Sequence, residues 1–167
     1  MSMIGNFRAS TDEEVEALLA DPERIEGVLY PDDDVLRAAA VEFDVDKAWH
    51  AIHFLLCGDA EKGQAPLNFV VAGGTEVGDV DVGYGPARVF TSKELAEIVR
   101  ALEPISSADL KKRYDAHSLT MQEVYPQIWD EPKADCLDNY VLYYFDRLKV
   151  FLRQVAAAGK ALIVYLN

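Results

Sequence analysis

A possible nucleophile, two possible bases and a large aromatic ring fall within one short stretch of this sequence. It runs Trp49-His50-Ala51-Ile52-His53-Phe54-Leu55-Leu56-Cys57 and is followed by Gly58. At helical spacing, His53 lies one turn after Trp49, and Cys57 lies one turn after His53. His53 could therefore act as a base toward the Cys57 thiol, or both could bind a metal. The alternative is a half-buried histidine that donates to a backbone carbonyl, beside a cysteine that serves as a small hydrophobic side chain.

Neither chemistry is completed elsewhere in the sequence. A nucleophilic pair needs an orienting group and an oxyanion site, and the sequence identifies neither. A metal site needs more ligands, and the remaining histidines are His50, which we expect to be exposed, and His117. GxSxG, HExxH and Walker sequences are missing as well. We therefore expect no metal, no cofactor and no catalytic residue, and we favour a protein that is not an enzyme.

A second group of candidates lies in the glycine-rich sequence Gly83-Tyr84-Gly85-Pro86-Ala87-Arg88. It begins like a dinucleotide-binding loop, but the third glycine is missing and Pro86 lacks a backbone donor. We interpret it as a tight turn that presents Tyr84 and Arg88. Arg88 could bind an anion through two hydrogen bonds, or it could pair with a carboxylate and hold the loop in place.

Aromatic residues supply the rest of a candidate ligand site. Tyr125 and Trp129 could wall a pocket together with Trp49 and Tyr84, or they could close the hydrophobic core. One hypothesis is therefore a binding domain or an enzyme with a pocket for a small anionic ligand, formed by Trp49, His53, Tyr84, Arg88, Tyr125 and Trp129.

The charge of the chain favours a different hypothesis. The net charge is -13, and residues 1–46 carry 13 acidic and 3 basic side chains. An acidic surface repels nucleic acid, whose backbone is bound by clustered Lys and Arg. It attracts a basic protein, so we favour a non-enzymatic binding protein, one variant of which is an immunity-type partner of a basic protein. The alternative is a solvated acidic face that keeps the protein soluble.

The elements that must position these residues predict an α+β fold, with several helices packed on a small mixed sheet. We expect a central last strand, because residues 161–166 are apolar on both faces. Capping boxes at Thr11 and Thr91 and a cap at Ser106 or Ser107 predict helix starts. Strands are expected at 3–9 and 87–90, helices near 12–20, 22–29, 46–57, 92–102, 107–114 and 133–158, a short helix or strand at 66–71, and irregular segments at 30–34, 73–85 and 115–132.

Length and composition favour one domain over residues 1–167, and half of the residues are hydrophobic. We find no apolar run of membrane-spanning length and no signal peptide pattern, so we expect a cytoplasmic protein without a membrane partner. Two cysteines, Cys57 and Cys136, do not form a disulfide framework.

Several segments together resemble the YfbM-like family, a bacterial domain family of unknown function. The matching stretches are Met3–Phe7, Asp44–Gly58, Pro66–Gly74, Gly83–Arg88 and Glu123–Pro126, with the C-terminal helix and strand. The resemblance implies an α+β fold and a cytoplasmic bacterial setting, and it supplies no activity or cofactor. Its pattern includes Asp46, Lys47, Trp49, His53 and Gly58. In this family the position of Cys57 accepts threonine, which argues against a thiol nucleophile.

Overall fold

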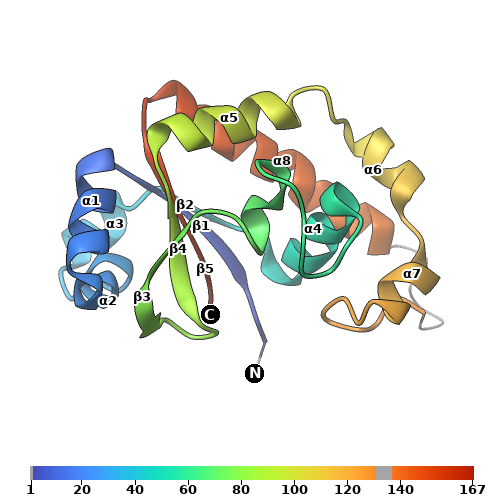
Figure 1. Ribbon diagram of the computed structural model, residues 1–167, viewed down its shortest axis with the longest axis horizontal. Helices are drawn as coiled ribbons and strands as arrows, with labels where there is room; N and C mark the ends of the chain where they lie inside the picture. The colour runs from blue at the N-terminus through green and yellow to red at the C-terminus, as the bar shows by residue number, and fades with distance from the viewer. Residues whose placement is uncertain (1, 131–136) are drawn as a thin grey trace.

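A five-stranded sheet forms the centre of the computed structural model, which describes residues 2–130 and 137–167 (Figure 1). The strand order is β2-β1-β5-β4-β3, and every neighbouring pair is antiparallel. The α+β prediction is confirmed, with an antiparallel sheet in place of a mixed one. The strands are β1 (Gly5–Ser10), β2 (Glu42–Asp44), β3 (Thr75–Asp81), β4 (Pro86–Phe90) and β5 (Ala161–Leu166).

Helices cover both faces of the sheet (Figure 1). One face carries α1 (Asp12–Ala20), η1 (Pro22–Arg24) and α2 (Ile25–Leu29), with α3 (Asp34–Ala39) beside them. The other face carries η2 (Asp46–Ala48), α4 (Trp49–Cys57), η3 (Leu67–Val70), α5 (Ser92–Leu102), α6 (Ser107–Arg113), α7 (Ala116–Met121) and α8 (Leu137–Ala157). The predicted part of the last helix at 133–136 lies outside the described residues.

Two hydrophobic cores result from this arrangement, one on each face of the sheet. Alternate residues of β5 enter different cores, with Val164 in the larger one under α4 and α8 and Ile163 in the smaller one under α1 and α2. This explains why the strand is apolar at every position, and it confirms the prediction that the strand is central.

Local capping chemistry fixes several helix ends as the sequence predicts. Thr91 and Glu94 form a complete capping box at the start of α5. Ser106 forms another with its N3 residue at the start of α6. The Thr11 side chain caps α1 as expected, but the Glu14 carboxylate accepts from the Ser10 hydroxyl and not from the Thr11 backbone.

The irregular segments are where the sequence prediction is wrong. Residues 75–81 form the edge strand β3, with Val77 buried and Thr75, Glu76, Asp79 and Asp81 exposed. The register of β3 against β4 shifts between Glu76 and Asp81, and Gly78, whose φ is 56°, lies in this irregular stretch. Helices α3 and α7 and the three-residue strand β2 also occupy segments where no element was predicted. Among the described residues, the helices are too short or too polar to cross a bilayer.

Candidate functional site

Helix α4, which carries the first candidates, is a core helix. Every residue from Trp49 to Leu56 is buried except His50. Its start packs directly on β1, because a Cβ added at Gly5 would lie 2.5 Å from the Cβ of Trp49. Its end is set by Gly58, whose backbone adopts the left-handed conformation with φ 76°. The predicted end at this glycine is therefore confirmed.

The His53 and Cys57 side chains lie together but are held in their neutral forms. The His53 ring is fully buried, and its Nε2 donates to the carbonyl of Lys62 at 3.1 Å. Cys57 Sγ lies 3.9 Å from Nδ1 of His53 and donates to the carbonyl of Leu67. Burial lowers the pKa of His53 to about 4 and raises the pKa of the Cys57 thiol to about 11. The pair is thus a neutral imidazole beside a neutral thiol, in a setting that opposes formation of a thiolate.

His50 is not exposed as predicted, because it joins α4 to a distant turn. Its Nε2 donates to the carbonyl of Ala60 at 2.8 Å, and its Nδ1 accepts from the backbone N–H of Tyr125 at 2.9 Å. The two bonds fix the neutral tautomer, and burial lowers the pKa of His50. This role could not be predicted from local sequence, since Tyr125 lies 75 residues further along the chain.

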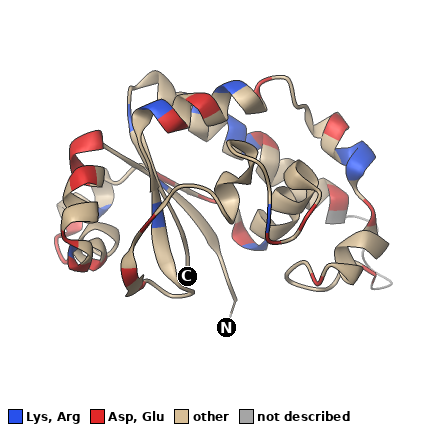
Figure 2. Cartoon of the chain, viewed as in Figure 1, with Lys and Arg blue, Asp and Glu red and all other residues tan. Residues whose placement is uncertain are grey.

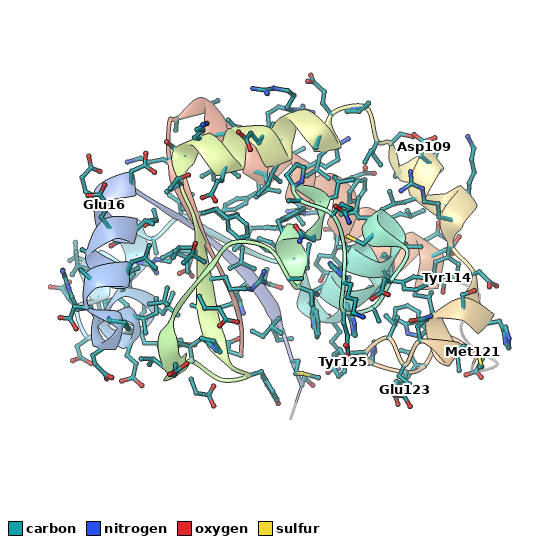
Figure 3. All side chains as sticks on the ribbon, viewed as in Figure 1. Glu16, Asp109, Tyr114, Met121, Glu123 and Tyr125 are labelled. Carbon is teal, nitrogen blue, oxygen red and sulfur yellow. The ribbon has the colours of Figure 1, made fainter. Side chains whose placement is uncertain are left out.

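Trp49 and Tyr125 are brought together, and they pack against the N-terminal segment. Their rings stack with centroids 5.8 Å apart. The Trp49 ring also stacks with the His50 ring, and these two centroids lie 4.7 Å apart. The indole N–H donates to the carbonyl of Met3, whose own N–H donates to the Tyr125 hydroxyl. Figure 3 shows Tyr125 in the turn after α7, near the end of the sheet where the chain begins.

Trp129 lies apart from this stack. Its ring is 1% exposed and contacts the edge of Tyr114, and its N–H donates to the carbonyl of Val124 at 2.7 Å. It therefore serves as a core side chain that closes the turn after α7.

The Arg88 side chain, on β4, binds the end of η3 and the turn that follows it. Its Nη1 donates to the carbonyls of Phe69 and Gly73 at 3.0 and 2.6 Å, and its Nη2 donates to that of Val70 at 2.5 Å. The sequence predicted an anion or a carboxylate partner, but backbone carbonyls take that place. Burial lowers the pKa of Arg88 to about 10, so the guanidinium stays charged at neutral pH.

Tyr84 and Arg88 line the same small cavity, as the glycine-rich sequence suggested. The cavity has a volume of about 150 Å³ and opens beside the hairpin of β3 and β4. Its other wall residue with a charge is Glu76, which the sequence analysis did not single out. The full set of lining residues is Val71, Glu76, Tyr84, Pro86, Arg88, Val164, Tyr165 and Leu166.

Acidic side chains gather on α1, α2 and α3, at one end of the molecule (Figure 2). In α1, α2, α3 and the turns between them, eight acidic residues are exposed: Glu13, Glu16, Asp21, Glu23, Glu26, Asp32, Asp33 and Asp34. Figure 3 shows Glu16 on the outer side of α1. We call this set, with α1–α3, the acidic lobe. In the described parts of the chain, no cluster of His, Cys, Asp and Glu could hold a metal ion.

Comparison with known proteins gives a family without an assigned activity. Residues 1–165 match the family model described as Domain of unknown function (DUF1877). The chain belongs to this family. The protein of unknown function YfbM from Escherichia coli has a similar crystal structure, with a TM-score of 0.74 and 22% sequence identity over 98% of this chain and 99% of that one. This likeness shows the fold, and no curated protein matches the chain.

The YfbM-like resemblance is thereby confirmed, and the six candidate residues can be sorted for this DUF1877 member. Two pairs are brought together, Trp49 with Tyr125 and Tyr84 with Arg88. The N–H donors of Trp49, His53 and Trp129 are each used by a backbone carbonyl. The features that the sequence analysis missed are Glu76 and the exposed apolar side chains of α3.

Proposed function

We propose that this protein is a non-enzymatic interaction protein whose acidic lobe binds a basic protein. The observation that carries the proposal is the composition of α3, where large apolar side chains are exposed to solvent directly after a run of aspartates. Val35 is 76% exposed and Leu36 is 60% exposed, directly after Asp32, Asp33 and Asp34. An apolar patch with a charged rim is the usual composition of a protein-binding surface.

The position of α3 supports the proposal, because the helix adds little to either core. None of its residues is buried, and it is held by local bonds. Asp33 caps it through Val35 and Leu36, and Arg37 donates to Asp34 and to the carbonyl of Pro31. A helix that packs so little against its own protein is free to pack against another.

A groove lies beside this helix and offers further apolar surface. It has a volume of about 240 Å³ and runs between α3 and the start of α1. Leu36, Ala39 and Val41 form one wall, and Val41 is 57% exposed. Arg8, Glu14 and Lys160 supply polar groups on the other side. The groove could receive an apolar side chain from the partner while the aspartates hold its Lys and Arg.

The charge of the acidic lobe would act mainly on the rate of association. A surface of one sign steers an oppositely charged partner, and this steering weakens as salt screens it. A bacterial immunity-type pairing, in which an acidic protein neutralises a basic one, is a specific form of the proposal. We propose a cytoplasmic location for this protein, which cell fractionation would test.

Affinity capture on matched variants tests the proposal. The first variant is Asp32→Asn/Asp33→Asn/Asp34→Asn, which removes three charges and keeps an asparagine cap at position 33. The second is Val35→Ser/Leu36→Ser, which removes the apolar patch. We expect the natural protein to capture a basic protein at low salt, and both variants to weaken the purified complex by about tenfold or more.

The control removes equal charge elsewhere through Glu97→Gln/Glu103→Gln/Glu123→Gln, three exposed positions outside the acidic lobe. We expect it to bind like the natural protein. Failure to capture any basic protein at low salt would contradict the proposal. So would a captured partner whose affinity is the same for the natural protein and both α3 variants.

A further inference from the structure

Two opposite charges face one cavity at the β3–β4 hairpin without pairing with each other. Glu76 and Arg88 are direct partners in the β3–β4 ladder, so their side chains leave the same face of the sheet. Both line the 150 Å³ cavity. The ion pairs found in the described part of the chain do not include this one. Arg88 instead extends toward the carbonyls of the turn after η3, and a space is left between the two charges.

The guanidinium of Arg88 keeps part of its binding capacity. It has five N–H groups in a planar fork, and three of them donate to carbonyls, two from Nη1 and one from Nη2. Among the described residues, Nε and the second Nη2 hydrogen donate to none. Nε and Nη2 share one edge of the fork, the edge along which a carboxylate can bind side-on. The three carbonyl bonds hold that edge in a fixed orientation.

The remaining walls of the cavity are mostly apolar. Val164 and Leu166 of β5 and Pro86 of β4 supply aliphatic surface, and Val71 closes one side. Tyr84 lies at the rim with 38% of its surface exposed, and its backbone N–H donates to the carbonyl of Leu166. The rim is thus tied to the last strand, and the cavity combines a cation, an anion and an apolar wall.

We propose that this cavity binds a small zwitterion, an α-amino acid with a short aliphatic side chain. Its carboxylate accepts from the free edge of Arg88, its ammonium donates to the Glu76 carboxylate, and its side chain packs against Pro86 and Val164. The ligand thereby completes an ion pair that the protein leaves open. A few convergent polar groups in an otherwise apolar pocket are typical of small-molecule sites.

The volume of the cavity limits the size of the ligand. A cavity of about 150 Å³ has room for several waters, or for a short aliphatic amino acid such as alanine or valine. The site is separate from the acidic lobe, so it is independent of the interaction with a basic protein.

The test is an NMR titration of the whole protein with L-valine, together with ligands that carry one charge each, isobutyrate and isobutylamine. We expect L-valine to shift the amides of residues 71, 76, 84 and 88 and to saturate. Each single-charge ligand should bind at least about tenfold more weakly. Isobutyrate loses the hydrogen bond to Glu76, and isobutylamine loses the hydrogen bonds from Arg88.

Glu76→Gln is the variant that decides the proposal, since Glu76 is exposed and its substitution leaves both cores intact. We expect it to weaken L-valine about tenfold while isobutyrate binds as before. Glu97→Gln, at an exposed position on α5 outside both the cavity and the acidic lobe, is the matched control and should leave L-valine binding unchanged. Three results would each overturn the proposal: no saturation with L-valine in the tens of millimolar, equal affinity for L-valine and isobutyrate, or unchanged L-valine affinity in Glu76→Gln. Capture of a basic protein is measured in a separate experiment, and its result does not depend on whether L-valine binds.

Discussion

At the scale of single residues, the interior polar groups of this protein act as structural ties. His53 and His50 each donate to a backbone carbonyl of the loop after α4, and Arg88 donates to carbonyls of η3 and of the turn that follows it. Buried polar groups must be hydrogen-bonded, so each of these loops gains a fixed place against the core. The same residue types in a solvated cleft would suggest acid–base chemistry. Here burial and hydrogen bonds to backbone carbonyls give them a structural role.

His53 gives the fold a dependence on pH whose sign follows from its burial. Its pKa is about 4 when folded and near 6.5 when unfolded, so the unfolded chain binds more protons between these values. The contribution is fully present above about pH 6.5 and is lost as pH falls toward 4. We expect the free energy of unfolding to fall by about 1–2 kcal/mol between pH 8 and pH 5 through this group. Urea denaturation across that range measures it.

His53→Gln supplies the comparison, because glutamine can still donate to the Lys62 carbonyl but does not titrate. Its pH dependence should be flatter than that of the natural protein and not absent, since burial also lowers the pKa of His50. His117→Gln replaces an exposed histidine and serves as the control. An equal slope in His53→Gln and the natural protein would show that His53 is not the source.

At the scale of elements, helix ends are governed by local backbone chemistry, and two glycines allow a direct test. Gly58 ends α4 with φ 76°, and a Cβ there would meet no atom within 4 Å, so any cost of Gly58→Ala is backbone strain. Gly27 lies inside α2 and also has open space for a Cβ. We expect Gly58→Ala to destabilise by about 1 kcal/mol and Gly27→Ala to stabilise by about 0.5 kcal/mol.

Urea denaturation of the two variants at neutral pH measures the pair, with the natural protein as reference. Because neither change adds a contact, opposite signs would separate backbone conformation from packing. A loss of stability in both variants would count against the left-handed cap as the reason for the glycine at position 58.

The same distinction explains which elements the sequence could predict. Caps such as Thr91 and Ser106 act within their own turn, so their helices were predicted correctly. Strand β5 was predicted because it is apolar at every position, as a strand buried on both faces must be. The edge strand β3 and the three residues of β2 depend on pairing with distant strands, and their own sequences are polar. Contacts of this kind cannot be seen from local pattern.

The candidate site shows the same limit. The sequence placed Tyr84 and Arg88 in one turn, and the structure places both at one cavity. It could not show that Arg88 uses the carbonyls of residues 69, 70 and 73, because those acceptors exist in every residue and only tertiary packing selects them. The place of Glu76 at the cavity could not be predicted for a related reason, since its register against Arg88 is set by the β3–β4 pairing.

At the scale of the whole molecule, charge is divided between two regions. The acidic lobe holds most of the net charge of -13, while α5 and α6 mix both signs (Figure 2). Like charges close together destabilise the compact state, and salt screens this repulsion. If the acidic lobe is kept for binding, the protein retains a repulsion that a purely structural surface would avoid.

This division predicts that salt stabilises the protein mainly through the acidic lobe. The free energy of unfolding should rise when NaCl increases from about 10 mM, where the Debye length is about 30 Å, to about 1 M, where it is about 3 Å. Removing three lobe charges by Glu16→Gln/Glu23→Gln/Glu26→Gln should raise stability at low salt by about 1 kcal/mol and flatten the salt dependence. The Glu97→Gln/Glu103→Gln/Glu123→Gln control removes equal charge outside the acidic lobe, at positions far apart in the sequence, so it should leave the salt dependence close to that of the natural protein. Equal flattening in both triple variants would mean that the repulsion is spread over the whole surface, and the acidic lobe would then have no special electrostatic place in the fold.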